Sequence, residues 1–165
     1  MTPAGPKRVL AVRVGRGGDL VMITPALRML LDGLPGAELD LLTSAEGPRI
    51  LRGFDPRLAR FHVYHRRFPG SLFLRPRLRA ALRREGYERI YLFESHPHYR
   101  ALVEGVAPEV HALAVAPPER HYCDRCLDVV ESTLQRPQPR GWISLPVTET
   151  ARAAASDYLA AHGLA

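Results

Sequence analysis

Hydrophobic residues occur along the chain with two different spacings. Five short apolar runs are separated by longer segments whose apolar residues recur at helical spacing. A regular alternation of strand and helix is typical of an α/β fold with a parallel sheet, because parallel strands need a crossover connection between them. The predicted strands are residues 8–14, 38–42, 60–64, 87–93 and 110–115.

The intervening segments predict helices, and the first of these contains a proline. Pro25 either kinks that helix or, with Thr24 as a cap, begins a second helix at a position where its missing N–H does no harm. The predicted helices are residues 19–34, 46–53, 78–85, 99–106, 122–134 and 148–162.

A proline-rich break at residues 136–141 suggests how the chain is organised. We predict a main domain over residues 1–141, followed by a linker strand and helix over residues 142–165. In an α/β chain such a helix is followed by another strand, so we expect a further domain beyond it.

The turn after the first strand, Gly15-Arg16-Gly17-Gly18-Asp19, is the main candidate site. Ligands of open α/β sheets bind beyond the carboxyl ends of the strands, and free amide groups at a helix N-terminus suit an anion. The turn is neither a complete G-x-G-x-x-G fingerprint nor a P-loop, which disfavours NAD and ATP. For Asp19 two interpretations are open: a helix N-cap and a general base.

Charge indicates an anionic partner. The net charge is +6, and residues 49–89 contain twelve arginines but only three acids. Nucleic acid, a phospholipid surface and a phosphorylated glycolipid all fit this segment, as does a solvated helix face without a partner. No nucleic-acid reading motif is recognised, so we expect no nucleic-acid partner.

Two cysteines, Cys123 and Cys126, form a lone C-x-x-C inside a predicted helix. Half a zinc site and a redox pair are the functional alternatives, but a second ligand pair and a preceding strand are both missing. We therefore interpret them as reduced thiols and expect no metal. The sequence shows no signal peptide and no apolar run of membrane-spanning length, which predicts a cytoplasmic protein.

Three stretches resemble the ADP-heptose:lipopolysaccharide heptosyltransferase family, glycosyltransferase family 9. Residues 82–90 are similar to the helix and strand entry of that family, and residues 121–128 to its His-x-x-x-Arg helix. The longest stretch, residues 8–44, reads RVLAVRVGRGGDLVMITPALRMLLDGLPGAELDLLTS.

The resemblance implies one half of a GT-B enzyme: a Rossmann-like, mostly parallel sheet flanked by helices that holds the acceptor. Asp19 would be the base of an inverting, metal-independent transfer, with Gly17 and Gly18 giving the acceptor access to the backbone. The ADP-sugar donor is expected on a C-terminal domain outside this chain, so the chain alone should be inactive. No cofactor is expected on this chain.

The expected acceptor is an anionic glycolipid or glycan of the lipopolysaccharide-core kind. Position and charge assign its binding to Arg16, Arg66 and Arg67. Glu94 and His96, after the fourth strand, depart from the family pattern and form either a second acid/base pair or ordinary turn residues. Peripheral contact with the inner face of the cell membrane is a further expectation.

A second hypothesis belongs to a different class of function. The chain could be a non-catalytic Rossmann-like module that uses the same basic surface to bind anionic lipid or saccharide. Substitution of Asp19 separates the two hypotheses, because only the first needs it for turnover.

Overall fold

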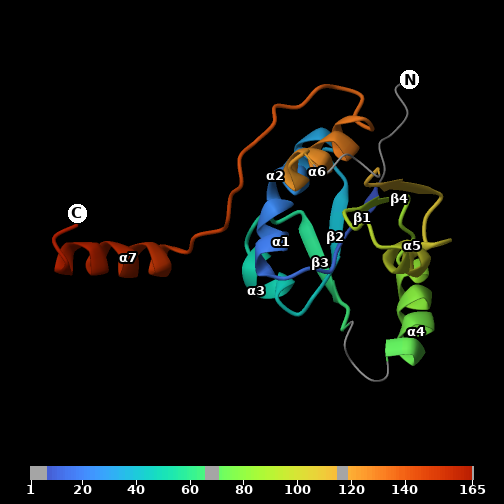
Figure 1. The fold of residues 1–165 in the computed structure, drawn as a ribbon, viewed down its shortest axis with the longest axis horizontal. Coiled ribbons are helices and arrows are strands. Elements are labelled where there is room, and N and C mark those ends of the chain that lie inside the picture. Colours follow the sequence, from blue (N-terminus) through green and yellow to red (C-terminus); the bar gives the residue numbers. More distant parts are fainter. Residues whose placement is uncertain (1–6, 66–70, 115–118, 165) are drawn as a thin grey trace.

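The five predicted strands form one parallel sheet. In this computed structural model, which describes residues 7–65, 71–114 and 119–164, the strand order is β3-β2-β1-β4-β5 (Figure 1). Because the strand order reverses on either side of β1, the carboxyl ends of β1 and β4 form the switch point where ligands of such sheets bind. The strands are β1 (Arg8–Arg13), β2 (Glu38–Thr43), β3 (Leu58–Val63), β4 (Arg89–Leu92) and β5 (Glu109–Ala112).

Helices cover both faces of the sheet, which explains why the central strands are apolar throughout rather than at alternate positions. All four inner residues of β1 are buried. One face packs against α2 (Thr24–Gly33), α3 (Gly47–Leu51) and α6 (Tyr122–Glu131). The other packs against α4 (Ser71–Arg84) and α5 (Pro97–Val103), on the opposite side of the sheet in Figure 1.

The predicted first helix is two helices, α1 (Gly17–Met22) and α2. Pro25 lies in the first turn of α2, so the second of the two alternatives holds, although Ile23 rather than Thr24 is the N-cap. The Thr24 hydroxyl instead donates to the Val21 carbonyl at 2.8 Å. At the break between the two helices, the Thr24 side chain therefore satisfies a backbone carbonyl at the end of α1.

Helix α4 begins at Ser71, seven residues earlier than predicted, and contains Pro76. Pro76 lies in the second turn, where proline lacks the N–H that would donate to the carbonyl four residues before it. The predicted helix start at residue 78 is therefore wrong.

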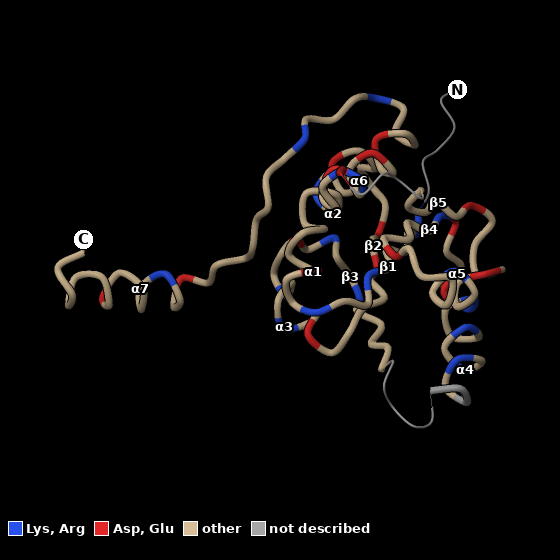
Figure 2. Tube along the Cα trace, in the orientation of Figure 1, with Lys and Arg blue, Asp and Glu red and all other residues tan. Residues whose placement is uncertain are grey.

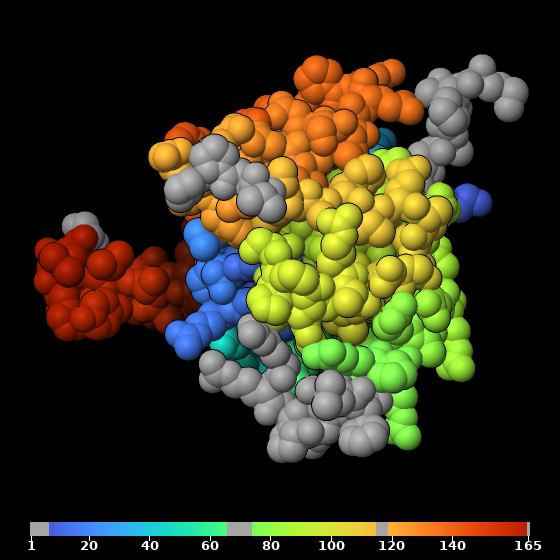
Figure 3. Space-filling model, turned by 45° about the vertical axis from the view of Figure 1, so that its right-hand side comes forward, coloured from blue at the N-terminus to red at the C-terminus, as the bar shows by residue number. Residues whose placement is uncertain are grey.

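The C-terminal segment lies away from the sheet. Residues 142–147 form no strand, in contrast to the prediction, and the Ser144 N–H donates to Thr24 Oγ1 at 3.1 Å. Helix α7 (Glu149–Ala161) begins at the N-cap Thr148 and buries none of its residues. It extends from the body of the protein in Figure 1 and again in Figure 3. None of the described helices is long and apolar enough to span a membrane.

Candidate active site

Asp19 lies at the carboxyl end of β1, in the first turn of α1. The N-cap of this helix is Arg16, so the N-cap interpretation of Asp19 is wrong by three positions. The side chain reaches back instead, and Asp19 Oδ2 accepts from the Arg16 N–H at 2.9 Å. This contact satisfies a backbone donor that the helix leaves free, as the acid of a capping box does.

The second carboxylate oxygen of Asp19 pairs with an arginine. Arg13 Nη2 lies 3.0 Å from Asp19 Oδ1. The Asp19 side chain is 34% exposed, whereas that of Arg13 is only 13% exposed. The carboxylate is therefore oriented from the protein side by two donors while part of it stays open to solvent.

Arg13 also holds the acid that follows β4. Its Nη1 donates to Glu94 Oε2 at 3.1 Å and to the Phe93 carbonyl at 3.0 Å. Glu94 Oε1 in turn accepts from the Val14 N–H at 2.7 Å. Glu94 thus ties the ends of β1 and β4 together.

An aromatic ring from α6 completes the surroundings of Arg13. The guanidinium carbon lies 4.6 Å from the centroid of the Tyr122 ring, at cation–π distance, and the Tyr122 hydroxyl donates to the Phe93 carbonyl at 2.6 Å. Burial opposes the charge on Arg13, but Tyr122, Glu94 and Asp19 outweigh it and raise the pKa of Arg13. For Tyr122, burial itself raises the pKa of the hydroxyl, so this group stays a neutral donor.

Sequence reasoning missed both Arg13 and Tyr122. The available signal for Arg13 was a cation that ends an otherwise apolar strand immediately before the glycine-rich turn. Tyr122 gave no comparable signal, because an aromatic residue at the start of an amphipathic helix is usually part of the core.

The glycines of the turn have different surroundings. A Cβ atom at Gly15 would lie 2.5 Å from both Cβ and Oδ2 of Asp19. At Gly17 it would lie 3.0 Å from Glu46 Oε2, and at Gly18 it would meet no atom within 4 Å. Gly15 belongs to the predicted turn but was given no role there, and it makes room for the Asp19 side chain. A Cβ at Gly18 would face open space.

The other predicted site residues divide into three groups. Arg16 is exposed beside Asp19. Arg66 and Arg67 lie outside the described residues. His96 is the N-cap of α5, where its Nδ1 accepts from the His98 N–H at 3.2 Å. Glu94 and His96 thus each contact neighbouring structure, and their acid/base pairing stays a prediction.

A second polar cluster lies near the carboxyl ends of the strands, between β3 and α5. Arg75 Nη2 lies 2.6 Å from His98 Nδ1, and His98 Nε2 lies 2.9 Å from the Tyr64 hydroxyl. Because a guanidinium can only donate, Nδ1 of His98 accepts and the ring proton belongs on Nε2. The cluster therefore links α4 to α5 through a neutral imidazole.

Neither the cysteines nor the apolar pocket offers a competing site. Burial raises the pKa of the Cys126 thiol to about 12, and that of Cys123 is also raised, so neither is an activated thiolate. Within residues 7–65, 71–114 and 119–164, no three His, Cys, Asp or Glu side chains gather as metal ligands would.

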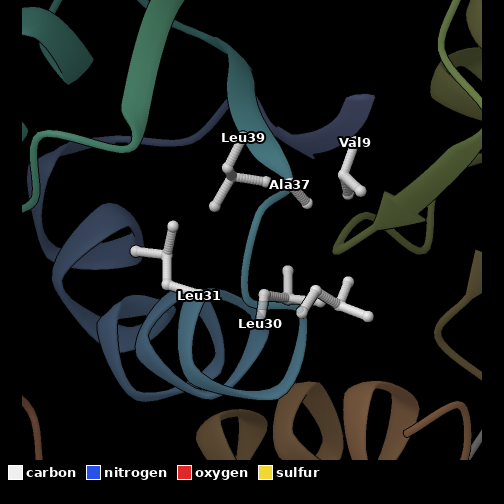
Figure 4. A pocket seen from close by; sticks show the side chains of 6 residues that line it. Val9, Leu30, Leu31, Ala37 and Leu39 are labelled. Carbon is white, nitrogen blue, oxygen red and sulfur yellow. The ribbon is translucent and has the colours of Figure 1, made fainter. Parts of the chain in front are cut away.

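The pocket in Figure 4 lies near the amino ends of β1 and β2, remote from Asp19, and has essentially no volume that a water-sized molecule could occupy. Ligand pockets usually have about 300 Å³ or more. Its lining is apolar throughout: Val9, Leu30, Leu31, Leu34, Ala37 and Leu39.

Comparison with known proteins finds similarity at the level of structure. No protein-family model and no curated protein sequence matches the chain. A glycosyl transferase family 9 structure from Veillonella parvula DSM 2008 superposes with a TM-score of 0.74 at 15% identity, over 98% of this chain and 51% of that one.

Two Escherichia coli structures give similar values. Heptosyltransferase WaaC, solved with ADP, has a TM-score of 0.67 at 18% identity, over 83% of this chain and 50% of its own. ADP-heptose lps heptosyltransferase II has a TM-score of 0.64 at 18% identity, over 92% and 50% respectively.

The chain thus spans about half the length of the structures it resembles, and at these identities the likeness is one of fold. The similar structures are of the same kind as the family that the sequence resembles. The fold class is therefore confirmed: this chain has the parallel, Rossmann-like fold that makes up about half of a heptosyltransferase or family 9 glycosyltransferase.

Proposed function

We propose that the chain is the acceptor-binding half of an inverting, metal-independent glycosyltransferase. The sugar is heptose-like, the donor an ADP-sugar and the acceptor a lipopolysaccharide-core or similar glycan. The observation that carries the proposal is the orientation of Asp19 by Arg13 and the Arg16 N–H at the carboxyl end of β1, in a fold shared with heptosyltransferases.

In the proposed reaction Asp19 acts as the general base. It accepts the proton of an acceptor hydroxyl while that oxygen attacks the anomeric carbon, and the bond from this carbon to the ADP phosphate breaks. Attack on the side opposite the leaving group inverts the anomeric configuration. Arg13 does not touch the sugars; it holds the carboxylate oxygen Oδ1 so that the exposed part of Asp19 faces the acceptor.

The donor would be bound by a second domain. One similar structure contains ADP and another an ADP-heptose analogue, which supports a nucleotide-sugar donor. Exposed apolar side chains near the C-terminal end of this chain, including Trp142 at 92% and Tyr158 at 60%, give such a domain a surface to pack on. The chain alone would then not turn over.

An anionic acceptor fits the basic character of the chain, which has a net charge of +6. We further propose that the reaction takes place in the cytoplasm, in peripheral contact with the inner face of the cell membrane. Arg16 is exposed beside Asp19, and a Cβ atom at Gly18 would meet no atom within 4 Å. These features allow an acceptor to reach the carboxylate along the start of α1.

The test joins the chain to a family 9 donor domain and measures sugar transfer from ADP-heptose to a core glycolipid. The proposal predicts transfer that persists in EDTA and yields the inverted anomer by NMR. Retention of configuration or loss of activity in EDTA would contradict the mechanism. Tight glycolipid binding without any transfer would favour the non-catalytic module instead.

A further inference from the structure

Helix α4 carries an exposed stripe with two cations that have no partner among the residues that the structure describes. Leu74, Arg77, Ala81 and Arg84 follow one another at spacings of three and four residues, so they share one face, and all four are exposed. Neither Arg77 nor Arg84 has a hydrogen bond or ion pair to any residue the structure describes. The helix contains no acid, and its arginines stand out along α4 in Figure 2.

The remaining arginines of α4 are engaged, and this contrast defines the stripe. Arg79 Nη2 donates to the Glu104 carbonyl at 2.7 Å, and Arg83 Nε to the Gly105 carbonyl at 3.0 Å. Both carbonyls follow the C-terminus of α5, so this flank of α4 is fixed to the protein. The flank with Arg77 and Arg84 is left to solvent.

We propose that the stripe Leu74, Arg77, Ala81 and Arg84 docks the protein on an anionic phospholipid bilayer. The two arginines lie seven residues apart, about 10 Å along the helix. Their long apolar stems can lie along the lipid interface while the guanidinium groups reach the phosphates, and Leu74, 38% exposed, can insert beside them.

A bilayer suits this surface better than a small anion does. The stripe is the convex face of a helix, and Figure 3 shows α4 and α5 together on the outside of the molecule. A single phosphate or sugar acid would need convergent donors in a concave site, whereas a bilayer presents many phosphates to separated cations. The inference rests on the proposed membrane contact but not on Asp19.

The experiment uses the 165-residue chain and floated vesicles of phosphatidylcholine, alone or mixed with equal parts phosphatidylglycerol. We expect binding to the anionic vesicles only. Arg77→Gln with Arg84→Gln should weaken partitioning roughly 30-fold, as two cations at an anionic surface would. The matched control is Arg49→Gln with Arg52→Gln, which removes the same charge from two exposed residues of the α3 region.

If both double variants lost vesicle binding equally, net charge alone would explain the effect and the proposed docking surface would be wrong. The proposal would also be wrong if the parent chain did not bind the anionic vesicles. Tighter binding to a DNA duplex, lost in the Arg77/Arg84 variant, would assign the stripe to nucleic acid and overturn it as well. Urea unfolding checks that the variants fold. Asp19→Asn should bind vesicles like the parent chain, so this test can succeed or fail independently of the catalytic proposal.

Insertion of the stripe gives a second readout. Trp142 is the single tryptophan, so Leu74→Trp in a Trp142→Phe background places a lone fluorophore on the stripe. Its emission should shift to the blue with anionic vesicles, because the indole leaves water. An unshifted spectrum under conditions of full binding would contradict the proposed orientation.

Discussion

Arg13 Nη2 lies 3.0 Å from Asp19 Oδ1, and the same guanidinium lies 3.1 Å from Glu94 Oε2. One arginine at the end of β1 therefore orients both the candidate base and the acid that follows the neighbouring strand. The side chains of Arg13 and Glu94 are only 13% and 10% exposed. One guanidinium therefore faces two carboxylates, and Arg13 is a shared ion-pair partner of both acids.

Replacement of Arg13 should affect stability more than replacement of a surface arginine. Arg13→Gln removes the mostly buried ion pair between Arg13 and Glu94, and we expect a loss of about 2–4 kcal/mol in the free energy of unfolding. Urea denaturation measures it. Arg152→Gln is the control, because its 3.9 Å contact with Glu149 is exposed and should contribute little. Similar small effects in both variants would show that the Arg13 network does not stabilise the fold.

Two glycines of the turn should respond in opposite ways to an added methyl group. Gly15→Ala places a Cβ 2.5 Å from Asp19 Oδ2 and should displace that side chain, at a cost of about 1–3 kcal/mol. Gly18→Ala meets no atom within 4 Å and lies inside α1, so it should be neutral or stabilise by up to about 1 kcal/mol. Thermal and urea unfolding of the pair measure the difference, and equal effects would mean that Asp19 is not held where the structure places it.

The sequence predicts the sheet well because its signals are local. The runs that became β1 and β4 are mostly apolar, and the run that became β2 alternates polar and apolar residues, so each indicates a strand. The Gly15 to Asp19 turn lies at the sheet edge where ligands of open α/β sheets generally bind. Helix boundaries were harder to predict near proline: Pro25 lies in the first turn of α2, where proline is tolerated, whereas Pro76 lies inside α4.

The details of the site could not be predicted, because they depend on contacts between distant residues. Arg13 and Glu94 are 81 residues apart, and Tyr122 lies a further 28 residues along the chain. Nothing in a single sequence indicates that these side chains meet. The room that Gly15 leaves for the Asp19 side chain likewise follows from backbone geometry, which the sequence does not indicate.

A buried carboxylate elsewhere in the sheet should make stability depend on pH. Asp40 Oδ2 accepts from the Tyr87 hydroxyl at 2.6 Å and from Arg8 at 2.8 Å, with His62 Nε2 3.7 Å away. Burial opposes ionisation, but the contacts with His62, Tyr87 and Arg8 outweigh it and lower the pKa of Asp40.

The stabilisation from Asp40 is therefore fully present above its unfolded pKa of 3.8 and is lost as the pH falls through the lower, folded value. In urea unfolding, Asp40→Asn should be less stable than the parent at neutral pH, and the difference should shrink below about pH 4. Asp157→Asn, on the exposed helix α7, serves as the control. A difference that stays constant into acid would contradict this assignment.

Helix α7 should contribute little to the stability of the sheet domain. It buries no residue, and within the described chain residues 142–147 are joined to the body by the hydrogen bond from Ser144 to Thr24. A chain ending at residue 141 should therefore lose at most about 1 kcal/mol. Hydrogen exchange should find the α7 amides unprotected, because an isolated helix of this length is marginal in water. Strong protection or a large loss of stability would show that α7 packs on this domain instead of a partner.

The most direct test of the account is Asp19→Asn in the chain joined to a donor domain, with turnover and acceptor binding measured together. The substitution keeps the size of the side chain but removes the base, so we predict that kcat falls by about 100-fold or more while the acceptor Kd stays within about threefold. Turnover equal to that of the parent enzyme would remove Asp19 as the base and contradict the proposed mechanism.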